Sequence, residues 1–209
     1  MKKVILAVLT AISLSLPAIA QPVQPQVVSS FEDLMAVCSQ KSGETVVSFD
    51  DGVSDIVTGT PIEVLLKRTN YSSEALSKTL DQAWKLYQNG CTDINATAQQ
   101  GNTILHLIVR ATPDQWPTKL DQWIKAGVRD VPNTYGKTAL QELEEDMRNI
   151  IKDNRSHRSA ISYRLPAEYT QARRVLKNTP EEKQRREMRR QAEQELHMQM
   201  LENIAKTDK

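Results

Sequence analysis

The stretch from Asp93 to Leu107, DINATAQQGNTILHL, predicts more about the architecture of this chain than any other segment. It places a turn, a glycine and a helix start in the order that a stacking repeat requires. A weaker copy follows from Asp130 to Leu140, DVPNTYGKTAL. Gly101 and Gly136 are 35 residues apart, a period in the range of proteins built from stacked helical units. The two segments therefore predict an architecture built for binding.

Helix starts recur along the chain with the same local pattern. Thr60 precedes a proline at the first helical position and Glu63 at the third, which is a capping box with its proline in the favoured place. Such a threonine accepts a hydrogen bond from an otherwise unpaired backbone N–H, an effect of about 1 kcal/mol. The same pattern begins at Thr112, Thr138 and Thr179, without the proline at Thr138.

Helix ends are also marked, and strands are nearly absent from the pattern. Asn89-Gly90 and Ala126-Gly127 place a glycine where a left-handed cap residue is required. The only strand that we predict spans Glu44 to Asp50. We expect a mainly α fold, with helical segments at Ile62 to Lys67, Leu76 to Gln88, Ile104 to Arg110 and Leu120 to Lys125.

Paired short helices joined through such turns resemble the ankyrin repeat family. The resemblance lies in four matching motifs: Gly90-x-x-Asp93, Gly101 to Leu107, Gly127-x-x-Asp130 and Gly136 to Leu140. It implies a projecting turn followed by an inner helix, capped by Thr103, whose residues Leu105 and Leu107 face the neighbouring unit. It also implies that His106 is structural and hydrogen-bonds across the turn.

The chain departs from the family pattern at several positions. Ile104 replaces the usual proline, Ile108-Val109 replace a pair of small residues, and the tract from Ala111 to Lys119 exceeds the family loop. We expect bulkier residues to change the spacing or curvature of the stack. The resemblance implies a short helical solenoid of two to three units over residues 58–178, capped by residues 21–57 and by a charged C-terminal helix at 179–209.

Residues 1–20 have the pattern of a signal peptide. Lys2 and Lys3 precede an apolar run from Val4 to Leu16, and Ala18-Ile19-Ala20 supplies the small-x-small site that a signal peptidase needs. The run is too short for a spanning helix, which requires about 20 apolar residues. We expect export to the bacterial periplasm and no membrane insertion after cleavage; a retained membrane anchor is the alternative.

Cysteine and charge usage agree with export. The chain has two cysteines, Cys38 and Cys91, and an even pair in an oxidising compartment is expected to form a disulfide. Two thiols without a nearby histidine pair make a poor metal site. Without Lys2 and Lys3, 25 basic residues stand against 26 acidic ones, so no long-range attraction for nucleic acid or anionic lipid is expected.

The C-terminal segment from Pro180 to Lys206 predicts one long helix. It lacks glycine and internal proline, and an apolar or small residue recurs at every fourth position. Three readings stay open: a helix that docks on the stack, a partner-binding or self-associating coiled coil, and a solvated helix. The apolar positions are Met188, Ala192, Leu196, Met200 and Ile204.

No catalytic pattern is found in the sequence. Zinc-protease, serine-hydrolase and phosphate-binding glycine motifs are all absent. Asp50-Asp51-Gly52 lacks the spaced ligands of a calcium loop and predicts a turn. We therefore expect no enzyme activity, no cofactor and no metal.

The ankyrin resemblance implies a protein-binding module that uses its turn tips and the groove of its inner helices. Tyr135 and Trp116 are expected to contribute most of the binding energy, because aromatic residues dominate interfaces. By association with exported ankyrin-like proteins, the resemblance implies immunity to a periplasm-acting toxin, or an accessory role for an oxidative-stress enzyme. The alternative is a scaffold that self-associates through the C-terminal helix. The expected partner-binding residues are Thr97, Gln99, Gln100, Asn102, Arg110, Trp116, Tyr135 and Lys137.

Overall fold

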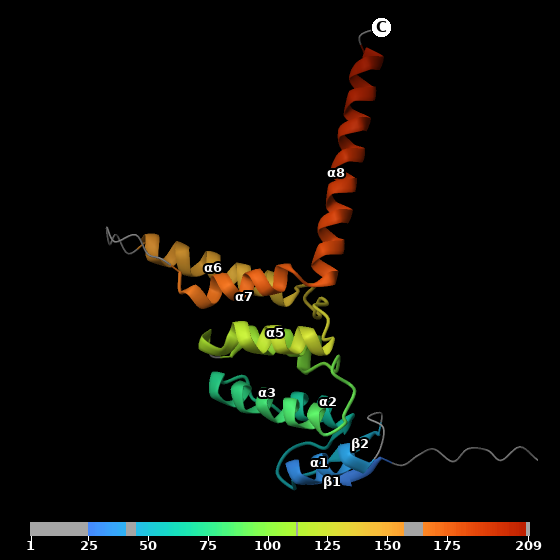
Figure 1. Cartoon of the computed structure of the whole chain (residues 1–209), viewed down its shortest axis with the longest axis vertical. Helices are drawn as coiled ribbons and strands as arrows, with labels where there is room; N and C mark the ends of the chain where they lie inside the picture. The colour runs from blue at the N-terminus through green and yellow to red at the C-terminus, as the bar shows by residue number, and fades with distance from the viewer. Residues whose placement is uncertain (1–24, 41–44, 112, 157–164, 208–209) are drawn as a thin grey trace, which may run out of the picture.

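The computed structural model describes residues 25–40, 45–111, 113–156 and 165–207. These ranges are mainly helical, with eight α-helices and one three-stranded sheet, which confirms the predicted mainly α class. The elements follow one another along a single long axis, from the sheet at one end to a projecting helix at the other (Figure 1). The expected signal peptide at residues 1–20 lies outside the described residues.

The sheet and one helix form the N-terminal end of the molecule. Strand β2 (Val47–Phe49) pairs in parallel with β1 (Gln26–Val28) and antiparallel with β3 (Val57–Gly59), next to helix α1 (Phe31–Gln40). The prediction of a single strand was therefore wrong, although β2 lies within the predicted range. Each strand has three residues, too few for the alternation of apolar and polar residues by which a strand is recognised.

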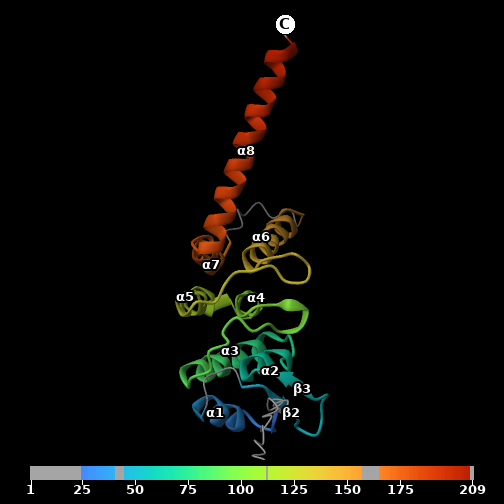
Figure 2. The same ribbon diagram turned by 90° about the vertical axis from the view of Figure 1, so that its right-hand side faces the viewer.

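Three pairs of helices lie one above another beyond this end (Figure 2). They are α2 (Pro61–Lys67) with α3 (Ser73–Gln88), α4 (Ile104–Arg110) with α5 (Trp116–Ala126), and α6 (Ala139–Ser156) with α7 (Ala167–Lys177). Successive pairs are in contact through α3 with α4, α4 with α6, and α5 with α7. Helix α4 is the centre of the core, because every side chain from Ile104 to Val109 is buried.

The helix starts follow the predicted capping pattern wherever the structure describes them. Thr60 and Glu63 form the full capping box at the start of α2. At the start of α6, the Gln141 N–H donates to the Thr138 hydroxyl and the Thr138 N–H donates back to the Gln141 side chain. Thr112 lies outside the described residues, and α5 begins later, after the 3-10 turn η2 (Pro113–Gln115).

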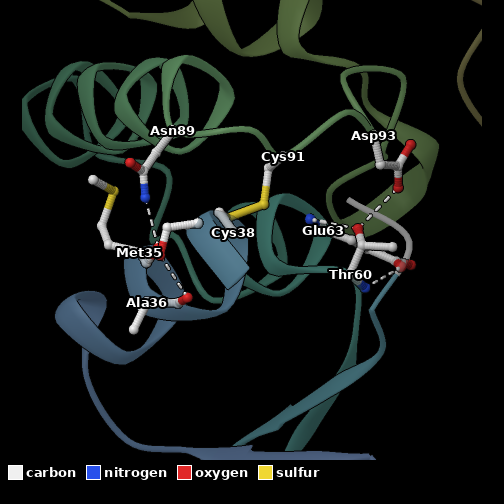
Figure 3. Close-up of a disulfide and its surroundings, with 9 residues drawn as sticks. Met35, Ala36, Cys38, Thr60, Glu63, Asn89, Cys91 and Asp93 are labelled. Atoms are coloured by element: carbon white, nitrogen blue, oxygen red, sulfur yellow. Dashed lines mark hydrogen bonds between the residues drawn. A yellow bond between two sulfur atoms is a disulfide. The ribbon is translucent and has the colours of Figure 1, made fainter. Parts of the chain in front are cut away.

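A disulfide joins Cys38 on α1 to Cys91 in the loop after α3, with a Cα–Cα distance of 4.9 Å. Figure 3 shows this bond beside a second link between the same two segments, in which the Asn89 amide donates to the Met35 carbonyl at 2.6 Å. The predicted disulfide is thus confirmed. It fastens the N-terminal end to the first helix pair.

Helix α8 (Pro180–Thr207) leaves the last helix pair and projects away from it (Figure 1). Its base is held by Arg185, whose Nη1 donates to the Asp130 carbonyl at 3.1 Å and whose Nη2 lies 3.6 Å from Oδ2 of that residue. Asp130 Oδ1 accepts from the Ala139 N–H. Burial raises the pKa of the Asp130 carboxyl. Of the three readings of this helix, docking therefore applies to its first turns.

Candidate partner-binding surface

Hydrogen bonds link the turns of successive helix pairs into one continuous edge. The Gln99 amide donates to the carbonyl of Lys67, the last residue of α2, at 3.2 Å, and the Tyr71 hydroxyl donates to the Gln99 carbonyl at 3.3 Å. In the next turn, the N–H and the hydroxyl of Thr134 both donate to the Gln100 carbonyl, at 3.0 and 2.9 Å. We name this strip the turn edge and define it as residues 67–71, 97–103 and 131–137.

The backbone at the tip of the second turn is held in an unusual conformation. Gln100 has a φ of 62° and is the only non-glycine residue with a positive φ in the described ranges. Such a conformation costs a non-glycine residue about 1–2 kcal/mol. At Gly101, φ is 69° and an added Cβ would lie 3.3 Å from Thr134, so the close approach of the two turns requires a glycine. The backbone of this tip is therefore held in one defined conformation.

A polar network connects the turn edge to helices α4 and α6. The Asn133 amide donates to Asn102 Oδ1 at 3.0 Å and to Glu142 Oε1 at 2.9 Å. Arg110 forms a two-point ion pair with Glu142, at 3.0 and 2.7 Å. Fully satisfied networks of this kind rigidify the structure around them. Asn102 is completely buried, and the expectation that it contacts a partner is corrected: it positions the turn instead.

His106 fastens α4 to the turn of the next helix pair. It is fully buried, its Nδ1 lies 3.2 Å from the Thr103 N–H nitrogen, and its Nε2 lies 2.9 Å from the Lys137 carbonyl oxygen. The Thr103 amide donates to Nδ1, so the ring proton is on Nε2 and is donated to Lys137. A hydrogen bond across the turn is the structural arrangement expected for this residue.

A shallow pocket of about 450 Å³ opens beside the third turn, which contains Tyr135 and Lys137. Tyr135 lines this pocket and is 64% exposed. Arg110, which also lines the pocket, has its guanidinium carbon 5.9 Å from the centre of the Tyr71 ring. The pocket thus combines one exposed aromatic ring with five charged side chains. The lining residues are Arg110, Tyr135, Lys137, Glu142, Glu145 and Asp146.

The charges in this pocket are unevenly paired. Glu142 forms an ion pair with Arg110, and Glu145 forms one with Lys137. Among the described residues, Asp146 has no ion-pair partner. Burial, followed by the nearby carboxylates of Glu142 and Glu145, raises the pKa of Asp146. The pocket therefore has excess negative charge next to an exposed aromatic ring, which suits a cationic side chain of a partner.

The structure brings together part of the predicted binding set. Arg110, Tyr135 and Lys137 meet in the pocket. Gln99 and Gln100 are exposed on the neighbouring tip, and Thr97 is half-buried there. Four further residues of this surface were not among the predicted binding residues. Three of them follow the Thr138 cap on α6 at a spacing of three or four residues, which places them on one face of the helix. The missed residues are Tyr71, Glu142, Glu145 and Asp146.

Trp116 is the second residue for which the expected contact with a partner is corrected. It is buried, begins α5, donates from Nε1 to the Ala111 carbonyl at 3.0 Å, and packs edge-to-face on Tyr169 at 4.7 Å. The sequence placed it in a long exposed loop. In the structure that loop is shortened by η2 and by the early start of α5, so Trp116 is a core residue.

Comparison with family models, curated proteins and solved structures gives no match. Within the described ranges, no helix has the length and apolarity needed to cross a bilayer. In the same part of the chain, no group of three or more His, Cys, Asp or Glu side chains is arranged to hold a metal ion.

Proposed function

We propose that this protein is a periplasmic protein-binding module with an ankyrin-like architecture, and that its partner binds on the turn edge. The observation that carries the proposal is Tyr135, a largely exposed aromatic side chain on a hydrogen-bonded turn beside a charged pocket. Exposed tyrosines on rigid turns supply large contact area at low entropic cost.

Equivalent positions in successive helix pairs support the ankyrin-like part of the proposal. Thr103 precedes α4 and Thr138 precedes α6, 35 residues apart. Leu105 and Leu140, the second residues of these helices, are both buried. Together with the cross-turn hydrogen bond of His106, these features match the pattern by which ankyrin repeats stack.

The turn edge is held in a fixed geometry, which favours its use as a binding surface. Six hydrogen bonds between or within its turns, donated by Gln99, Tyr71, Thr134 and Asn102, hold its backbone in place. A surface that is already ordered loses little entropy when a partner docks. The disulfide fits an oxidising compartment, and the near-neutral charge of the chain disfavours nucleic acid as the ligand.

Within this proposal, the biological role that we favour is immunity to a periplasm-acting toxin, with an accessory role for an oxidative-stress enzyme as the alternative. Both roles require a stoichiometric protein complex and no catalysis. The excess negative charge around Asp146 predicts a basic side chain in the partner's contact region.

Replacing both Tyr135 and Gln99 by alanine is expected to weaken partner binding at least tenfold, because truncation of a central hot-spot aromatic residue costs about 2 kcal/mol or more and about 1.4 kcal/mol is a factor of ten. The immobilised protein would be used to capture its partner from periplasmic extract, and the affinity for the purified partner would then be measured by calorimetry. Thermal unfolding should shift only slightly, since both side chains are exposed and the change removes a single exposed hydrogen bond, from the Gln99 amide to the Lys67 carbonyl.

A matched control replaces Val53 and Gln88 by alanine, two exposed positions away from the turn edge. This control should bind as the unmodified protein does. Equal affinity of the Tyr135→Ala, Gln99→Ala variant and the unmodified protein would remove the turn edge as the binding surface.

A further inference from the structure

Beyond its base, helix α8 exposes a series of large apolar side chains. Met188, Leu196, Met198, Met200 and Leu201 are each 48–59% exposed. Beyond its first turns the helix extends away from the stack in both views (Figures 1 and 2). Apolar side chains in such number on a projecting helix are typical of an interaction surface.

One end of this surface is a groove between α8 and α6. Its volume is about 520 Å³, and its apolar lining comes from Leu140 on α6 and from Met188 and Ala192 on α8. Residues four apart on a helix lie on nearly the same face, with a rotation of about 40° at each step. The face that starts in the groove therefore continues outward through Leu196 and Met200.

Opposite charges occupy the two halves of the same helix. Residues 183–190 contain five Lys or Arg side chains and one Glu, whereas residues 193–202 contain three Glu and no Lys or Arg. Glu182 contacts Arg185, Arg186 and Arg189 and offsets part of the basic charge. Arg190 remains 71% exposed at its side chain, and Glu193 and Glu195 are exposed further along.

We propose that the partner of this face is α8 of a second copy of the chain, packed antiparallel. In this orientation the basic half of each helix lies along the acidic half of the other, with Arg190 near Glu195 of the second copy. A parallel pair would place like charges side by side, which destabilises helix pairs. The centre of the antiparallel pair falls near Ala192, whose small side chain permits close approach of the two axes.

The size of the contact predicts a weak and reversible dimer. An overlap of about 20 residues is about 30 Å long, roughly three heptads of a two-stranded coiled coil. The groove beside Leu140 lies next to the crossing point and adds apolar surface to the contact. This groove and the pocket at Tyr135 share no lining residue, so dimerisation and partner binding involve different side chains.

Sedimentation equilibrium of the purified protein tests the proposal. The unmodified protein is expected to form a dimer with a dissociation constant in the micromolar range, weakened by added salt because exposed charges are screened. Replacing Leu196 and Met200 by glutamine, which keeps the charge pattern and the helix propensity, should weaken the dimer at least tenfold. An unmodified protein that stays monomeric up to about 0.5 mM overturns the proposal.

Reciprocal charge reversals test the orientation. One variant carries Lys183→Glu with Arg190→Glu, and the other carries Glu193→Lys with Glu195→Lys; each alone should dimerise at least tenfold more weakly. A mixture of the two should recover a dimer containing one copy of each. The matched control, Lys78→Glu with Lys85→Glu on α3, reverses two exposed charges and should dimerise as the unmodified protein does.

Cysteine cross-linking distinguishes the two helix directions independently of charge. Ala192→Cys lies near the two-fold axis of the antiparallel pair and should form an intermolecular disulfide under mild oxidation. Gln199→Cys should not, because antiparallel packing separates the two copies of that residue by about 20 Å. Cross-linking of Gln199→Cys as efficient as that of Ala192→Cys, or a dimer unaffected by both charge reversals, contradicts the antiparallel pair.

Discussion

Replacing Cys38 and Cys91 by alanine is expected to lower the free energy of unfolding by about 4 kcal/mol, the largest effect that we predict for any change in this chain. The two residues are 53 positions apart, and in the entropy model closing a loop of that length removes conformational entropy and so raises the free energy of the unfolded chain by about this much. Alanine keeps both buried positions apolar, so the loss measures the crosslink more than the packing. Urea unfolding followed by circular dichroism provides the measurement.

The unmodified protein under reducing conditions is the matched comparison. It should unfold at nearly the same urea concentration as the double alanine variant, because both lack the crosslink. The remaining link between α1 and the α3 loop, from Asn89 to Met35, should leave the N-terminal end partly attached. Unfolding that is indifferent to both changes would mean that the thiols are not bonded in the native protein.

Leu105→Ala is expected to lower the free energy of unfolding by about 3 kcal/mol, within the range of 2–5 found for buried leucines. Leu105 is completely buried at the start of α4, and α4 contacts α3, α5 and α6. A cavity there removes contacts with more than one helix pair at once. Chemical denaturation of the variant and of Leu140→Ala, at the equivalent position of α6, measures the two costs.

Val53→Ala is the control for these leucines, since Val53 is 89% exposed and its truncation should cost less than about 0.5 kcal/mol. If Leu105→Ala costs no more than Val53→Ala, the layers are not held together by the apolar faces of their inner helices.

Local signals explain why much of the helical architecture could be predicted. A capping threonine, a proline at the first helical position and a glycine at the end act within one or two turns, so α2, α4 and α8 begin within two residues of the predicted starts. The disulfide could be predicted because the chain has an even number of cysteines. Strands β1 and β3 carry no such signal, because three residues become a strand only through pairing with distant segments.

The exposure of the expected binding residues was predicted correctly where it depends on the turn itself. Tyr135, Lys137 and Gln99 flank glycines or sit at a tip, and they are exposed. The predicted exposure of Asn102 and Trp116 was wrong because each is buried by a distant residue. Asn102 is covered by Asn133, 31 residues further along the chain, and Trp116 by Tyr169, 53 residues further along. No local pattern reveals such a neighbour.

Photo-crosslinking from the turn edge in living cells tests the protein-binding role most directly. A photoreactive phenylalanine analogue placed at position 135 is expected to form one covalent adduct with a different protein, whereas the same analogue at Lys85, exposed on α3, should form none. Adducts that are the same from both positions, or that contain only a second copy of this chain, would contradict a partner-binding surface at Tyr135.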